Sequence, residues 1–364
     1  MSSANEASPV RRLVLHGRRI ARVVRGDASE PQLLSPVCQR SGMVMETQHP
    51  IVVHRRREHD GVPVNDRQLR QSVSEGTYRR VVAGSYVRDA DWKRLKPMQQ
   101  HLVRVLEVAD RARGPVVFTH SAAAAIHGID RIGAWPIRVD VRIAQSTGGR
   151  SSGAIRRRAL GFEDVETLEW RGHRVTSPAQ TAVDLASEGT FTAGVIALDQ
   201  ALWARRPGGA LAVCEDAERA LESNRRRGAA RVPAAIEFST ALADSVRESE
   251  GRVILTQLGF PEPVLQKEFA LPNGRIVKTD FYFPEYDHVG EFDGTGKYFD
   301  PDILHGRTPE QALLEEKDRA DALRRQVSGL SRWRTPDHRD PARLYNILVA
   351  DGLPSRFPMP RRRK

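Results

Sequence analysis

The stretch KTDFYFPEYDHVGEFDGTGKY, residues 278–298, decides the fold of the C-terminal part of this 364-residue chain. Its beginning, Lys278–Phe283, is rich in aromatic side chains, and residues 284–287 are of the types that turns favour. Val289–Asp293 then resumes an extended pattern and ends at Gly294. We therefore predict two short strands joined by a tight turn.

Three acidic side chains of this hairpin are expected to meet at one edge of a sheet. Glu291 and Asp293 point the same way because side chains alternate along a strand. If the turn centres on residues 285–286, Asp280 lies opposite Glu291 on a strand about 5 Å away. Like charges this close repel unless a cation neutralises them, and Mg²⁺ prefers oxygen ligands. Asp280, Glu291 and Asp293 are therefore candidate metal ligands, and a solvated acidic hairpin is the alternative.

A wider set of residues accompanies the hairpin. It comprises Asp280, Glu291-Phe292-Asp293-Gly294, Lys297-Tyr298, the upstream Ser245-x-x-Glu248-Ser249-x-x-Arg252 and the downstream Glu316-Lys317-x-Arg319. The set resembles the nuclease-like domain of restriction-endonuclease-fold (PD-(D/E)XK) proteins related to very-short-patch repair endonucleases, over residues 240–350. The resemblance implies a mixed sheet flanked by helices and an Mg²⁺- or Mn²⁺-dependent endonuclease site.

The same resemblance assigns roles to individual residues. It implies that Asp280 and Glu291 hold the metal and that Asp293 or Glu248 completes the metal shell. It also implies that Lys297, or Lys317 as a second candidate, handles the attacking water or the phosphate. Glu248, Asp280, Glu291, Asp293 and Lys297 are thus the candidate catalytic residues. Asp293 occupies the position of the family's usual catalytic lysine. The resemblance therefore implies a nuclease site that is either active, with another lysine in that role, or vestigial.

The composition of the chain favours an anionic partner. Lys and Arg number 57 against 46 Asp and Glu, giving a formal net charge of +11. Nucleic acid is the commonest such partner, unless the charge only reflects an arginine-rich proteome. Cys38 and Cys214 form no CxxC pair, which disfavours a zinc site and fits a reducing cytoplasm. No apolar run approaches the length of a membrane span, and no secretion signal is recognisable.

The chain is predicted to be a multidomain α/β (α+β) protein. We expect a disordered or loosely packed extension at residues 1–56, a winged helix-turn-helix at 57–90, an α/β domain at 91–205, a linker with a charged helix at 206–235, the nuclease-like domain at 236–350 and a basic tail at 351–364. In the winged helix, Asn65 is the expected N-cap and Gly76 the expected helix end. Its candidate DNA contacts are Arg67, Arg70, Arg79 and Arg80, and a structural subdomain with a basic face is the alternative.

Periodicity predicts the remaining elements. Helices are expected over residues 97–113, 121–130, 236–260, 312–327 and 341–349, with a further helix that starts at Ser177-Pro178. Strands are expected over residues 137–143, 154–160, 169–175, 264–271, 276–283 and 330–334. Asn273-Gly274 is a strong hairpin turn between two of these strands.

A second set of motifs lies in the first two domains. It comprises Gly84-Ser85-Tyr86-Val87, His120-Ser121-Ala122-Ala123, His127-Gly128 and Val175-Thr176-Ser177-Pro178-Ala179-x-Thr181-x-x-Asp184-Leu185-Ala186. The set resembles AbiEi-type antitoxins of type IV toxin–antitoxin systems over residues 57–205. This implies a winged helix that binds promoter DNA and a nucleotidyltransferase-like toxin as partner. Because no GxSxG accompanies His120, His127 and Asp184, we predict structural roles for them and no hydrolase chemistry.

The combined interpretation is a DNA-binding protein with a metal-dependent endonuclease-like domain, active or vestigial. One alternative is a non-catalytic antitoxin and transcriptional repressor that uses the nuclease fold only for binding. Another is a structural protein that does not bind nucleic acid and whose basic charge is incidental. The sequence specifies neither the DNA site nor the oligomeric state.

Overall fold

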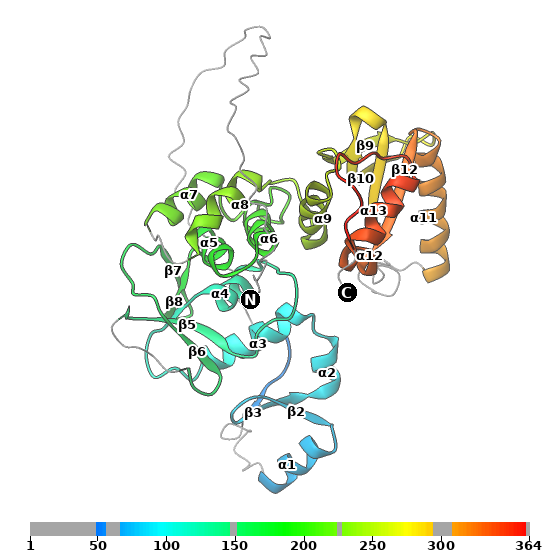
Figure 1. Cartoon of the computed structure of the whole chain (residues 1–364). Coiled ribbons are helices and arrows are strands. Elements are labelled where there is room, and N and C mark those ends of the chain that lie inside the picture. The colour runs from blue at the N-terminus through cyan, green and yellow to red at the C-terminus, as the bar shows by residue number, and fades with distance from the viewer. Residues whose placement is uncertain (1–48, 56–65, 146–150, 224–227, 294–307, 362–364) are drawn as a thin grey trace, which may run out of the picture. The chain divides into compact units, whose positions relative to one another are not determined.

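The computed structural model describes residues 49–55, 66–145, 151–223, 228–293 and 308–361 (Figure 1). The strands of these residues form three sheets on which the helices pack, so the chain is a mixed α/β protein. All of the described residues belong to one compact unit, Gly42–Lys364. In the described part of the chain, no helix has both the length and the apolar character needed to cross a membrane.

The first sheet has the strand order β1-β3-β2. Its elements are β1 (His54–Arg55), α1 (Asp66–Ser74), β2 (Tyr78–Val82), β3 (Ser85–Arg88), α2 (Asp89–Arg94) and α3 (Pro97–Ala109). Gly76 follows α1 with φ +76°, a conformation that suits glycine, and this matches the predicted helix end. Asn65, the expected N-cap, lies outside the described residues. β1 pairs with β3, so the extension expected over residues 1–56 is packed at His54–Arg55.

The second sheet has the order β6-β5-β4-β8-β7. Its strands are β4 (Val117–Phe118), β5 (Val139–Ile143), β6 (Ile155–Ala159), β7 (Thr167–Trp170) and β8 (His173–Thr176), and α4 (His120–His127) follows β4. The single strand predicted over residues 169–175 is wrong, because Arg171 and Gly172 turn with φ +50° and +73° and create the β7–β8 hairpin. The helix expected over residues 121–130 is α4, which begins one residue earlier and ends before Gly128.

A group of helices forms a separate apolar core. It contains α5 (Pro178–Glu188), α6 (Phe191–Leu202), α7 (Cys214–Ser223) and α8 (Val232–Phe238). The hydroxyl of Ser177 accepts a hydrogen bond from the backbone N–H of Gln180 at 3.3 Å, so the predicted helix start is confirmed. Ala217 and Val232 are buried in this core, so much of the expected linker at residues 206–235 is packed structure.

The long helix predicted over residues 236–260 is two helices. α8 ends at Phe238, and α9 (Val246–Gln257) begins after Ser245, whose hydroxyl accepts from the N–H of Glu248. The segment between them is bound to α6 by a hydrogen bond from the N–H of Thr240 to the carboxylate of Asp199 at 2.7 Å. The helical spacing of apolar residues continues across residues 239–245, so the break between the two helices was not predictable from that spacing.

α9 packs on both sides. Val253 is buried in the core of α5–α8, and Leu255 in the core of the third sheet. The guanidinium of Arg252 lies 3.1 Å from the fully buried carboxylate of Asp199 on α6. On the sheet side, a Cβ at Gly251 would come within 2.8 Å of the ring of Phe281, so glycine lets α9 lie close to the strands.

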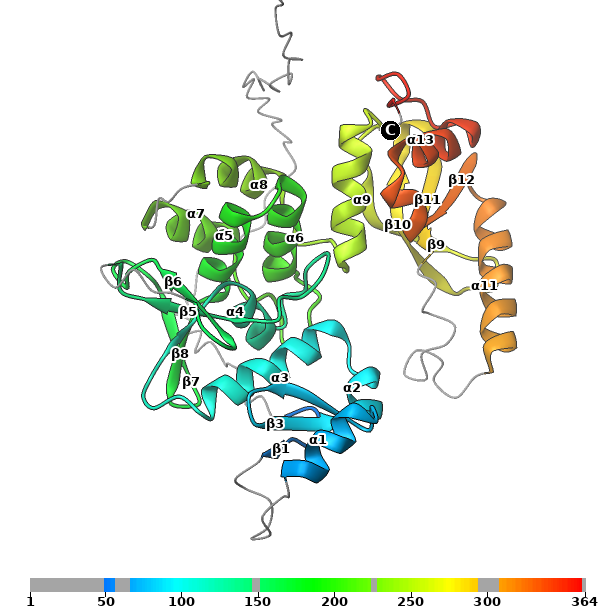
Figure 2. The same ribbon diagram turned by 60° about the horizontal axis from the view of Figure 1, so that its bottom comes forward.

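The third sheet has the order β12-β11-β10-β9. Its elements are β9 (Val264–Ala270), β10 (Ile276–Phe283), β11 (His288–Asp293), α11 (Pro309–Arg324), β12 (Gly329–Arg334), α12 (Thr335–Arg339) and α13 (Pro341–Ala350). β11 and β12 are parallel, and the other pairs are antiparallel. Figure 2 shows α9 and α11 on opposite sides of this sheet. Leu353 is fully buried against it, so the expected basic tail begins as packed chain.

Candidate functional site

The hairpin that carries the predicted carboxylates has the expected register. β10 and β11 pair from Phe283–His288 to Phe281–Gly290, so the next positions along are Asp280 and Glu291. At this point the Oδ2 atom of Asp280 accepts a hydrogen bond from the backbone N–H of Phe292 at 2.8 Å. Asp280 is thereby fixed where β10 and β11 end their regular pairing.

Glu248 is held in place by three hydrogen-bond donors. Its carboxylate accepts from the N–H of Asp244 at 3.0 Å, from the hydroxyl of Ser245 at 2.9 Å and from the side-chain amide of Gln266 at 2.9 Å. Only 6% of Glu248 is exposed. A buried carboxylate with several donors is fixed in orientation, as a metal ligand or an acid–base group must be.

Glu248 and Asp280 interact electrostatically although they come from different elements. Burial and, as a second cause, the negative charge of Asp280 together raise the pKa of Glu248 to about 7. Two neighbouring carboxylates with this repulsion form a donor set that suits a hard divalent cation. Asp293, half-buried at the end of β11, pairs with Arg334 in the β11–β12 ladder.

The two lysine candidates are not part of this cluster in the described chain. Lys297 lies outside the described residues. Lys317 is exposed on α11. The described residues therefore show an electrostatic interaction between Glu248 and Asp280, and of the two lysine candidates they include only Lys317.

Glu291 is occupied by arginines. Its carboxylate lies 2.9 Å from the guanidinium of Arg319 on α11 and 2.7 Å from that of Arg332 on β12. Both arginines also bind Glu316, whose pKa is lowered because these contacts outweigh the opposing effect of burial. With both oxygens paired to cations, Glu291 has no need of a metal, so the structure gives it a structural role in place of the ligand role that the sequence analysis expected.

The sequence analysis missed two residues that build the site. Gln266, which holds Glu248, has the unusual φ of +54° for a strand residue, and no local pattern marks it. Arg332 was read only as part of a strand. The signal that the sequence offered was Glu291 itself, a glutamate within a predicted strand. A carboxylate that is buried in a sheet needs a cationic partner from elsewhere in the chain.

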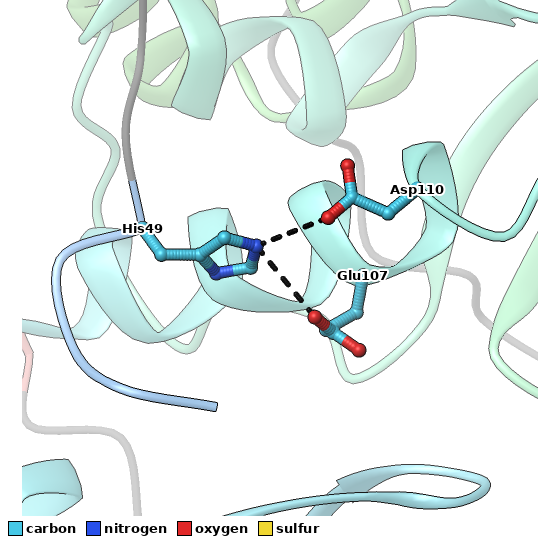
Figure 3. A group of neighbouring side chains, drawn as sticks. All are labelled: His49, Glu107 and Asp110. Carbon is cyan, nitrogen blue, oxygen red and sulfur yellow. Dashed lines mark hydrogen bonds and ion pairs between the residues drawn. The ribbon is translucent and has the colours of Figure 1, made fainter. Parts of the chain in front are cut away.

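A different cluster has the tightest arrangement of possible ligand atoms. Among the described residues, His49, Glu107 and Asp110 form the group of three whose ligand atoms lie within 4.8 Å of one another (Figure 3). Arg55 binds both carboxylates, Arg111 lies 3.5 Å from Glu107, and Arg171 lies 3.0 Å from Asp110. These guanidinium groups already neutralise the two acids, so the cluster fastens residues 49–55 to α3 and is a poor metal site.

The four arginines predicted to contact DNA are all exposed. Arg67 and Arg70 lie on α1, and Arg79 and Arg80 lie on β2. Arg79 also forms an ion pair with Asp89 at 2.7 Å, which fixes its position on the hairpin. The arrangement gives a helix and an adjacent hairpin that both carry exposed positive charge.

The polar residues of the second motif set are internal, as predicted. His127 bonds the carbonyl oxygen of Thr176 at 2.7 Å, and Asp184 accepts from the hydroxyl of Thr119 at 2.9 Å. Burial lowers the pKa of His127 to about 4, which keeps the imidazole neutral. The hydroxyl of Ser121 accepts from Arg131 at 2.9 Å. These contacts connect α4, β8 and α5.

Comparison with known proteins gives two curated relatives from Mycobacterium tuberculosis. The uncharacterized protein MT2308 of strain CDC 1551 / Oshkosh and the uncharacterized protein Rv2248 of strain ATCC 25618 / H37Rv are each 28% identical over 145 residues. The match covers 40% of this chain and 52% of each relative, so the chain spans about half their length. No family model and no solved structure matches.

Proposed function

We propose that the chain is a DNA-binding protein whose C-terminal part carries a metal-dependent, nuclease-like site, active or vestigial. The observation that supports this proposal is the electrostatic interaction between Glu248 of α9, which three donors hold, and Asp280 of β10, which accepts from the N–H of Phe292. A buried carboxylate whose pKa is raised in part by a second, fixed carboxylate is typical of functional sites.

Glu248 and Asp280, which interact electrostatically, are the residues proposed to hold a divalent cation. Asp293, at the end of the adjacent strand, is proposed as the third ligand, and Glu291 is left out because Arg319 and Arg332 bind it. Mg²⁺ or Mn²⁺ in such a site supplies positive charge that activates water and neutralises a phosphodiester. The chain contributes the fixed orientation of Glu248, through Ser245 and Gln266, and that of Asp280, through Phe292.

Cleavage assays test the proposal directly. The pure protein is incubated with supercoiled plasmid and with single-stranded DNA in Mg²⁺, Mn²⁺ or EDTA. We expect nicking only with a metal, its loss in Asp280→Asn, and its retention in Asp318→Asn, a matched change at an exposed residue of α11. In Lys297→Ala, cleavage should be lost while metal binding remains. Equal cleavage by wild type and Asp280→Asn would contradict the assignment.

A second candidate function is a non-catalytic antitoxin and repressor. The ion pairs of Glu291 favour it, because they remove one carboxylate from the expected ligand set. In this proposal the winged helix binds promoter DNA, the C-terminal domain is a binding module, and a nucleotidyltransferase-like toxin is the partner. The absence of any metal response, together with such a gene beside this one, would favour this candidate, whereas metal-dependent stabilisation without cleavage would favour a vestigial nuclease.

DNA binding should depend on salt and on the four exposed arginines. Each phosphate contact contributes about −0.9 to the slope of log K against log salt, so replacing Arg67, Arg70, Arg79 and Arg80 with alanine should flatten the slope and weaken binding. Fluorescence anisotropy over a range of salt concentrations measures both quantities. Arg219→Ala, on the exposed side of α7, is the matched control. An unchanged slope in the fourfold variant would exclude α1 and β2 from the interface.

A further inference from the structure

A polar cavity of about 460 Å³ lies beside the first turn of α9. It is lined by Asp130, Arg131, Ile132 and Gly133 of the loop after α4, by Gln200 of α6, and by Asp244, Ser245, Val246 and Arg247. Its volume is in the range of sites that enclose small molecules. Asp244 and Ser245 also hold Glu248 of the proposed metal site, and the other lining residues have no part in the functions proposed above.

Gln200 is the residue that marks this cavity as a ligand site. It lines the cavity and is only 6% exposed, yet within the described chain its side-chain amide makes no hydrogen bond. Solvent in the cavity reaches the atoms of this amide, which are not among the buried polar atoms without a partner in the described chain, so the amide is available to a bound molecule. A bound molecule that offers both a donor and an acceptor would satisfy it.

Positive groups converge on the same space. Arg131 and Arg247 line it, each fixed by a hydrogen bond, to Ser121 at 2.9 Å and to Glu250 at 2.6 Å. One fixed hydrogen bond leaves most of the five guanidinium donors for a ligand. The N-terminus of the 12-residue α9 adds its partial positive charge.

The acidic residues of the lining differ in availability. Asp244 is engaged by the indole N–H of Trp203 at 2.7 Å and by Arg205 at 2.6 Å. Asp130 accepts from the backbone N–H of Arg131. A carboxylate accepts several hydrogen bonds, so Asp130 keeps acceptor capacity for hydroxyl groups.

We propose that this cavity binds a 5′-mononucleotide. The phosphate is held by Arg131, Arg247 and the N-terminus of α9, which together provide charge-assisted donors. The ribose hydroxyls donate to Asp130, as sugar hydroxyls do to carboxylates in other nucleotide sites. The amide of Gln200 pairs with a polar edge of the base. This mixed lining suits a nucleotide better than inorganic phosphate, because phosphate would use neither the amide of Gln200 nor the remaining acceptor capacity of Asp130.

Isothermal titration of the full chain tests the proposal. The probes are AMP, GMP, CMP and UMP, the matching nucleosides and inorganic phosphate. We expect at least one mononucleotide to bind and its nucleoside to bind at least about tenfold more weakly, because a charge-assisted contact is lost. Arg247→Ala should weaken binding by a similar factor, and the exposed Arg219→Ala should leave the affinity unchanged.

Gln200→Leu separates a ligand site from a packing defect. Leucine has a similar size but no amide, so the variant should lose mononucleotide affinity while its melting temperature without ligand stays close to that of the wild type. Absence of binding by all four mononucleotides at millimolar concentration would overturn the proposal, as would unchanged affinity in both Gln200→Leu and Arg247→Ala. Binding of a 5′-phosphorylated oligonucleotide but of no free mononucleotide would overturn it in favour of a DNA end.

Discussion

In EDTA the protein should lose stability as the pH rises from about 5 to about 8, and Mg²⁺ should restore much of it. The pKa of Glu248 is about 7 in the fold against 4.5 ordinarily, so the folded state binds this proton more tightly than the unfolded chain. The protonated carboxyl group therefore contributes its full stabilisation when the pH is below the pKa of Glu248 in the unfolded chain. This contribution is lost as the pH rises past the pKa of Glu248 in the folded protein. The shift corresponds to about 3 kcal/mol.

Variants at Glu248 and Asp280 identify the source of this effect. In Glu248→Gln the side chain at this position cannot ionise, so the variant should lose the part of the pH dependence that Glu248 contributes in the wild type. The control variant Glu262→Gln, at an exposed position, should keep it. Asp280→Asn should abolish the response to Mg²⁺, which for the wild type is about 2.7 kcal/mol at a hundredfold excess over Kd. Thermal melts at several pH values measure both changes. A wild-type protein without any metal response would leave the repressor function as the better candidate.

Glu291→Ala should destabilise the fold by about 3–5 kcal/mol whether or not a divalent metal is present, because breaking a buried ion pair leaves uncompensated charge. Glu291 is only 4% exposed, and its removal leaves the partly buried guanidinium groups of Arg319 and Arg332 with one acidic partner, Glu316. Urea unfolding measures the loss.

The matched control for Glu291→Ala is Asp318→Ala, an exposed acidic residue on the same helix as Arg319. It should change stability by no more than about 0.5 kcal/mol. If Glu291 were instead a metal ligand, its replacement would cost little in EDTA, and the destabilisation would appear only when Mg²⁺ is added. The two titrations therefore separate a structural glutamate from a ligand.

Local features of the fold were predictable from the sequence. The bounds of β10, the turn at Asn273-Gly274 and the cap at Ser177 follow from side-chain alternation, left-handed glycine and hydroxyl capping, all of which act within a few residues. The β7–β8 hairpin was missed because its turn uses Arg171 in a positive-φ conformation that arginine rarely adopts.

The candidate site was only partly predictable because its decisive contacts are long-range. Asp280 and Glu248 were identified from residue type and spacing. The partners of Glu291 lie 28 and 41 residues further along the chain, in elements whose pairing with β11 no local pattern encodes. The register of β10 and β11 places Glu291 beside Asp280, as predicted. That register does not reveal that α11, with Arg319, covers Glu291.

Helix α9 also limits how a chain of this kind can change over evolution. A gene fusion that joined residues 246–361 to an unrelated protein would uncover Val253 and deprive Arg252 of Asp199. The C-terminal sheet is therefore not a freely exchangeable module, since it must be inherited together with α6. Replacements at positions 199 and 252 should accordingly appear in pairs among descendants of a common ancestor.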